Sequence, residues 1–240
     1  LRSHVLGDIY HSQLIEVGAP DGNVIFTDNN QEAYFRTINN YQAFKSTFDD
    51  RRNVLYAGSN SGLLHAFNAE TGEEEWAFLP PLLIGKLPTI INDNLDRAVD
   101  NGTRGGSNAI FGVDGSPVVH DVFMIGLQPN GQPETSPSWH TILFVPFGRG
   151  GSGFTVLDVT HTLDSIAADV DNPETNPGRG PLHMFTVYND YVNNVVYIAD
   201  HEGSIREEPY FSGAVGIQNS LEGQKAMDNL NDAIAQDGDS

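Results

Sequence analysis

The glycine-rich segment Gly148–Gly153 is the first feature that could do chemistry, because its sequence G-R-G-G-S-G satisfies the pattern G-x-G-x-x-G. In dinucleotide-binding proteins this loop follows a strand and opens a helix, whose N-terminus faces the pyrophosphate. An apolar strand precedes the loop here, but the residues that follow, F-T-V-L-D-V, are typical of a second strand. We therefore expect a hairpin loop whose glycines permit positive φ angles, and no nucleotide site.

Histidine and serine residues give no local signature of a catalytic or metal site. The eight His are scattered, and none forms H-E-x-x-H or another close metal-ligand spacing. His65 and His120 lie in apolar strands, so we expect them to be packed, hydrogen-bonded residues. There is no G-x-S-x-G elbow, although a Ser-His-Asp triad built from distant residues stays open at this stage.

One pair of aspartates has a spacing that could chelate a cation. Asp169 and Asp171 lie in the segment A-D-V-D-N-P-E. Exposed carboxylates on loops are ordinary, so a solvated loop is the favoured interpretation.

The composition excludes several classes of partner. The 240 residues include 12 Lys and Arg against 32 Asp and Glu, which gives a net charge of −20. This charge argues against binding nucleic acid through its phosphates and against an anionic membrane surface. It favours solubility, and an extracellular or saline setting with divalent cations is the alternative explanation.

Redox and targeting signals are few. The chain has no cysteine, so disulfides and Cys-based zinc sites are excluded. No apolar run is long enough for a bilayer span, so we expect no membrane insertion. No signal peptide is recognisable at the first residues, L-R-S-H-V-L-G-D, so an exported protein would carry its signal upstream of this sequence.

The elements that must position any site are organised around residues 53–78. This stretch predicts three short strands joined by two turns, one at Gly58–Gly62 and one at Asn68–Gly72. Such a meander cannot bury both faces alone and needs copies of itself. Two similar strand-turn-strand patterns follow, at about residues 141–158 and 194–206, so the sequence favours a repeat architecture over a sandwich.

Outside these strands the pattern changes. Residues 29–48 carry apolar and aromatic residues at helical spacings, which predicts a helical insertion of one or two short helices with its aromatic side chains turned inward. Residues 90–108 form a long polar loop of the kind that is usually functional or disordered. Residues 220–236 predict a C-terminal helix, with Ser220 as N-cap and Gly238 as stop.

Several of these motifs follow one another in a familiar order. They are G-D-I-Y-H-S (7–12), Y-A-G-S-N-S-G-L-L-H-A-F-N-A-E-T-G-E-E-E-W-A-F-L-P (56–80), V-D-G-S-P-V-V-H-D-V (113–122) and G-R-G-G-S-G-F-T-V-L-D-V-T (148–160). Together they resemble the C-terminal β-propeller of the PilY1 family of type IV pilus biogenesis factors and pilus-tip adhesins, and 66–76 resembles the tryptophan-docking motif of quinoprotein-type blades. The resemblance implies an all-β fold in which residues 1–240 form a β-propeller or a portion of one, with short helices in insertions and at the C-terminus. Seven blades would need roughly 300 residues, and this chain has room for about five.

The resemblance also raises the question of calcium. In some family members a loop of alternating acidic residues precedes a strand similar to V-Y-I-A-D-H-E-G (196–203). Here only Asp190 and Asn194 fall at ligand positions, while Thr186 and Tyr188 occupy other slots. Calcium takes about six to eight oxygen ligands, so we expect a degenerate loop, with Asp190 and Asn194 as its candidate metal ligands.

Function follows from the same resemblance. It implies a non-enzymatic protein of pilus biogenesis and tip adhesion, exported to the cell surface or pilus tip. Its partners would be minor pilus subunits or the pilus tip and a host or abiotic surface. The alternatives are a quinoprotein-like periplasmic enzyme, in which Trp76 would stack on a cofactor, and a generic extracellular propeller scaffold. The place of Trp76 in the docking motif favours packing against the next blade instead.

Overall fold

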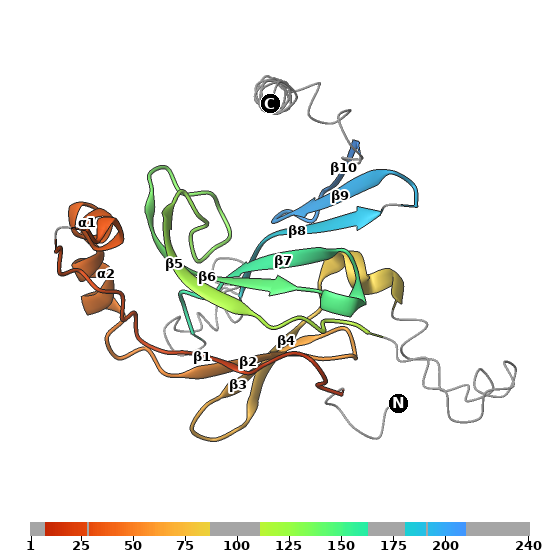
Figure 1. The fold of residues 1–240 in the computed structure, drawn as a ribbon, viewed down its shortest axis with the longest axis horizontal. Helices are drawn as coiled ribbons and strands as arrows, with labels where there is room; N and C mark the ends of the chain where they lie inside the picture. The colour runs from red at the N-terminus through yellow and green to blue at the C-terminus, as the bar shows by residue number, and fades with distance from the viewer. Residues whose placement is uncertain (1–7, 28, 87–110, 163–180, 191, 210–240) are drawn as a thin grey trace, which may run out of the picture.

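The computed structural model describes residues 8–27, 29–86, 111–162, 181–190 and 192–209, and these form two antiparallel sheets with two α-helices at one end (Figure 1). The first sheet has the strand order β1-β2-β3-β4, and the second has the order β10-β9-β8-β7-β6-β5. The predicted all-β class is confirmed. No helix in the described part of the chain has the length and apolar character to cross a bilayer.

The first sheet contains the meander predicted from residues 53–78. Its strands are β1 (Ile15–Val17), β2 (Val54–Gly58), β3 (Leu64–Asn68) and β4 (Glu74–Phe78). Gly62 and Gly72 have φ angles of 89° and 72° in the two turns, which only glycine adopts readily. In the second turn the Asn68 side chain accepts the backbone N–H groups of Glu70 and Thr71 at 2.9 and 3.1 Å. The turn chemistry visible in the sequence therefore sets the register of the meander.

The second sheet is wider than one repeat unit. Its strands are β5 (Val118–Met124), β6 (Ser138–Pro146), β7 (Gly153–Asp158), β8 (Leu182–Asp190), β9 (Val195–Asp200) and β10 (Ile205–Pro209). The two later strand-turn-strand patterns form hairpins, β6–β7 and β9–β10. They share one sheet because β8 pairs with both β7 and β9.

The main core lies between the two sheets. Its buried residues come from both of them, and from the short 3₁₀ helix η1 (Pro81–Lys86) that follows β4. Trp76 is half-buried against this core, and its ring lies 5.5 Å from that of Tyr56 in the same sheet. Trp76 therefore packs against a core to which both sheets contribute.

A second, aromatic core holds the helices. Helix α1 (Gln31–Ile38) and helix α2 (Tyr41–Thr47) lie inside the segment 29–48. Tyr41 and Phe44 are buried with Trp139 of β6, and the Trp139 indole N–H donates to the Asn39 carbonyl at 2.8 Å. The expected inward orientation is not uniform, since Phe35 remains 46% exposed.

Some predictions fall on residues that the structure does not describe. The C-terminal helix at 220–236, the long loop at 90–108 and the aspartates Asp169 and Asp171 all lie outside the described ranges.

Candidate functional site

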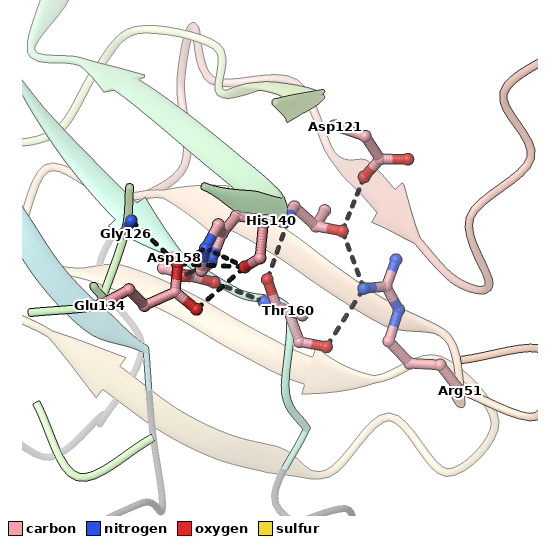
Figure 2. Close-up of polar contacts among 9 residues, drawn as sticks. Arg51, Asp121, Gly126, Glu134, His140, Asp158 and Thr160 are labelled. Carbon is pink, nitrogen blue, oxygen red and sulfur yellow. Dashed lines mark hydrogen bonds and ion pairs between the residues drawn. The ribbon is translucent and has the colours of Figure 1, made fainter. Parts of the chain in front are cut away.

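A buried arginine connects the two sheets. Arg51, which precedes β2, is 8% exposed. Its Nε donates to the Gly18 carbonyl at 2.7 Å, and its Nη1 donates to Thr141 Oγ1 at 2.9 Å and to the Thr160 carbonyl at 3.2 Å (Figure 2). Burial lowers the pKa of Arg51, whereas the charge of Asp121 opposes that shift. The guanidinium thus joins the end of β1 to β6 and to the end of β7.

Asp121 on β5 extends the network to the helices. Its Oδ1 accepts the Thr141 hydroxyl at 2.7 Å, and its Oδ2 accepts the Tyr41 hydroxyl. Burial, and then the hydrogen bond and charge of Asp121, raise the pKa of Tyr41, so this phenol stays a donor. Tyr41 therefore ties α2 to the second sheet through the same carboxylate that faces Arg51.

The second half of the network is centred on His140, which is 5% exposed. Its Nδ1 lies 2.6 Å from Asp158 Oδ2, and its Nε2 lies 3.0 Å from Glu134 Oε2 (Figure 2). Burial works against a charged ring, but hydrogen bonds and charge from Asp158 and Glu134 outweigh it and raise the pKa of His140. Carboxylates at both ring nitrogens favour the doubly protonated, charged ring.

Glu134 holds the loop between β5 and β6 over this histidine. Burial alone would raise the pKa of Glu134, but hydrogen bonds from His140, from the Gly126 N–H at 3.2 Å and from Ser138 lower it. Both partners of the pair are therefore shifted toward their charged forms. The two halves of the network meet at Thr160, whose N–H donates to Asp158 Oδ1 and whose Oγ1 accepts the Thr141 N–H, each at 2.9 Å.

Ser138, His140 and Asp158 lie in the order of a serine-hydrolase triad, with Ser138 Oγ 2.9 Å from His140 Nε2. Such a triad needs a neutral imidazole that accepts the serine proton. Here two carboxylates favour the charged ring, and the Ser138 hydroxyl lies 2.9 and 3.0 Å from the two Glu134 oxygens. Its proton is therefore directed to a carboxylate, and His140 is not placed as a general base.

A second Ser-His-acid arrangement lies in the first sheet. His65 is fully buried, with Nε2 3.0 Å from Ser59 Oγ and Nδ1 bonded to Glu74. Ser59 is itself only 1% exposed, so no substrate reaches it. His65 is the packed, hydrogen-bonded residue that the sequence predicts. His120, by contrast, has a side chain that is 62% exposed.

The predicted metal ligands lie at the β8–β9 turn. Asp190 Oδ1 accepts the backbone N–H groups of Val192 and Asn193, each at 3.1 Å, and Oδ2 accepts the Asn193 side chain at 2.8 Å. These bonds, led by the Asn193 side chain, lower the pKa of Asp190. Asn194 adopts a positive φ of 55°. The carboxylate thus shapes the turn, and calcium binding by Asp190 and Asn194 remains a prediction.

The glycine loop has a packing role. Gly148 has a φ of 57°, and a Cβ on Gly150 would overlap the carbonyl oxygen of Gly112, which crosses the loop. A strand follows at Gly153, as the sequence predicts, and the helical start that a dinucleotide requires is absent from the described residues 153–158.

A pocket of about 380 Å³ adjoins the His140 cluster. It lies between α2, the β5–β6 loop and the ends of β6 and β7. Its aromatic lining residues are Phe44, Phe48, Phe123 and Trp139, and its ionisable ones are Glu134, His140, Asp158 and His161. No group of three His, Cys, Asp or Glu within the described ranges is arranged to hold a metal ion.

Sequence reasoning missed this cluster. A signal was present, since His140 and Thr141 interrupt the apolar strand and Asp158 closes another. Polar residues inside buried strands need partners, and a charged one needs a countercharge.

Comparison with known proteins identifies the family. Residues 6–174 match the model of the PilY1 beta-propeller domain. The chain belongs to the PilY1 β-propeller family. It is 31% identical over 252 residues to the type IV pilus biogenesis factor PilY1 of Pseudomonas aeruginosa strain UCBPP-PA14. The alignment covers 98% of this chain and 20% of that relative.

Another curated relative and a solved structure also match. A PilY1 homolog of Xylella fastidiosa strain Temecula1 is 34% identical over 160 residues, covering 67% of this chain and 11% of the relative. The crystal structure of the Pseudomonas aeruginosa PilY1 C-terminal domain aligns with a TM-score of 0.37 and 22% identity, covering 84% of this chain and 37% of that one. The chain therefore spans about a fifth or less of the curated PilY1 proteins it matches.

Proposed function

We propose that this chain is the β-propeller part of a non-enzymatic type IV pilus biogenesis factor that acts as a rigid binding scaffold. The observation that carries the proposal is the family match over residues 6–174, together with relatives that are named pilus biogenesis factors. The protein would act outside the cell, at the surface or the pilus tip. Its partners there would be minor pilus subunits and a host or abiotic surface.

The chemistry of the site supports a scaffold over an enzyme. The triad-like serine at position 138 faces a carboxylate and a histidine whose partners favour the charged ring, which does not suit that histidine to act as a general base. The same network joins α2, both sheets and the β5–β6 loop through hydrogen bonds. Polar side chains that hydrogen-bond between elements stabilise one arrangement of the loops, and a binding scaffold requires such a fixed arrangement.

The test uses the full-length gene in its own organism. Deleting the segment that encodes this chain should reduce piliation and remove the protein from sheared pilus fractions. A Ser138→Ala variant should restore both to the wild-type level, because the hydroxyl does no chemistry. Normal piliation in the deletion strain, together with failure to recover the wild-type protein from pilus fractions of the parent strain, would rule out the pilus role.

The enzymatic alternative has its own readout. Absorbance spectra and mass spectrometry of native protein, prepared with calcium, would detect a bound quinone. Loss of function in Ser138→Ala, with an unchanged circular dichroism spectrum, would likewise favour catalysis over scaffolding.

A further inference from the structure

The buried network of Figure 2 carries an unbalanced charge. It contains three carboxylates and two cations, which leaves one negative charge in excess. The five groups are Asp121, Glu134, Asp158, Arg51 and His140. Asp158 is buried, and Asp121 and Glu134 are half-buried. Charges placed in this way are usually paired, so the excess favours a bound countercharge.

No Lys or Arg side chain of the described residues lines the pocket beside Glu134 and Asp158. Arg36 pairs with Glu32 at 3.1 Å, and Arg52 pairs with Glu75 at 2.8 Å. His161 lines the pocket beside the cluster, but burial lowers the pKa of His161, so its ring is neutral at neutral pH. The described residues around the pocket therefore leave the excess in place.

The excess charge is accessible from the 380 Å³ pocket, because Glu134 and Asp158 both line it. Glu134 Oε1 accepts only the Ser138 hydroxyl among the bonds between described residues, and Asp158 Oδ1 accepts only the Thr160 N–H. A carboxylate oxygen has two lone pairs, so both atoms retain capacity for another donor.

Four aromatic side chains also line the pocket, among polar and aliphatic residues. Phe44 and Phe48 come from α2 and its end, and Phe123 and Trp139 come from β5 and β6. Aromatic faces attract cations, and their apolar surface also packs an aliphatic chain. The negative charge of the carboxylates repels an anionic ligand. A neutral apolar ligand would fit beside the aromatic side chains but would leave that negative charge uncompensated.

We propose that this pocket binds a primary ammonium group carried on an aliphatic chain, as in the side chain of lysine. The ammonium would donate to the free lone pairs of Glu134 and Asp158, and the methylene chain would pack between Phe48 and Trp139. The inference is independent of the pilus role, since it rests on the charge and lining of the pocket.

The test is a binding titration on the purified chain. The Trp76→Phe variant leaves Trp139 as the single tryptophan and the reporter of the pocket. The probes are N-acetyl-lysine methylamide, its uncharged analogue N-acetyl-norleucine methylamide, and n-butylammonium. We expect a saturable fluorescence change with the charged probes, and at least tenfold weaker binding of the norleucine analogue. Tighter binding of the lysine probe would indicate a protein side chain as ligand, and tighter binding of n-butylammonium a free amine.

Variants locate the site. Glu134→Gln should weaken binding of the charged probes about tenfold or more, because it removes a charge-assisted hydrogen bond. Glu202→Gln, on the exposed β9–β10 turn, is the matched control and should leave binding unchanged. Phe48→Leu keeps every charge of the network and tests the aromatic wall, should Glu134→Gln fail to fold. Equal binding of the norleucine analogue, no saturable signal, or full binding by both pocket variants would overturn the proposal.

Discussion

Replacing the buried Arg51 by methionine should strongly destabilise the fold, although arginine substitutions on a protein surface usually have little effect. Methionine keeps the unbranched apolar stem but removes the guanidinium, which donates to Gly18, Thr141 and Thr160. Three acceptors then lose their donor, and Asp121 loses the cation it faces.

The magnitude follows from what is left behind. Leaving a buried acceptor without its donor costs about 1–3 kcal/mol. Arg51→Met does this to three acceptors and removes the cation near the half-buried Asp121. A domain is stable by about 5–15 kcal/mol, so Arg51→Met should remove a large share of the free energy of unfolding. Arg206→Met is the control, since that side chain is 69% exposed and should change stability by about 0.5 kcal/mol or less.

Urea denaturation followed by tryptophan fluorescence measures both variants. Asp121→Asn should cost less in the Arg51→Met background than in the wild type, because the carboxylate has already lost the nearby guanidinium there. A loss below about 1 kcal/mol for Arg51→Met, or strict additivity of the two changes, would refute the account of the network.

Three other predictions test separate parts of the fold. Trp76→Ala should lower the unfolding free energy by about 2–4 kcal/mol, as truncation of a half-buried aromatic ring does, and thermal melting checks it. Gly150→Ala should cost about 2 kcal/mol or more because its Cβ overlaps the Gly112 carbonyl, whereas Gly85→Ala, with open space around it, should melt as the wild type does. The raised pKa of His140 stabilises the fold fully below the unfolded value of about 6.5 and loses that effect as the pH rises through the folded value. The stability difference between wild type and His140→Gln, measured in urea at a series of pH values, should therefore shrink from pH 5.5 to alkaline pH, and a constant difference would contradict the assignment.

The meander was predictable because its signals are local. Short apolar runs and turns with glycine at positive φ, such as Gly62 and Gly72, specify hairpins within a few residues. The same holds for the strand after Gly148–Gly153, since the residue types alone excluded a helix there. How the hairpins combine was not predictable, because β8 joins two of them through pairings with strands on both sides.

The site was hidden for the same physical reason. Arg51 lies in the run D-D-R-R, which resembles an ordinary charged break between elements. Its partners Thr141 and Thr160 are 90 and 109 residues away, so burial of the guanidinium depends on tertiary packing. His140 and Asp158 are closer, 18 residues apart, but their contact requires that β6 pair with β7. A composition rule that places arginine on the surface fails where a fold needs a long donor to join two sheets.

The two Ser-His-acid arrangements show why geometry alone does not identify an enzyme. A histidine within a strand presents two nitrogens in opposite directions, so it can bridge a hydroxyl on one side and a carboxylate on the other. The chain uses this bridge twice, at His65 and at His140, on different sheets. In the first case the serine is buried, and in the second the additional carboxylate of Glu134 favours the charged ring. Catalysis needs an accessible nucleophile and a neutral base together, and each cluster lacks one of them. In both cases the histidine joins groups from neighbouring strands through hydrogen bonds, so each cluster fastens its own sheet.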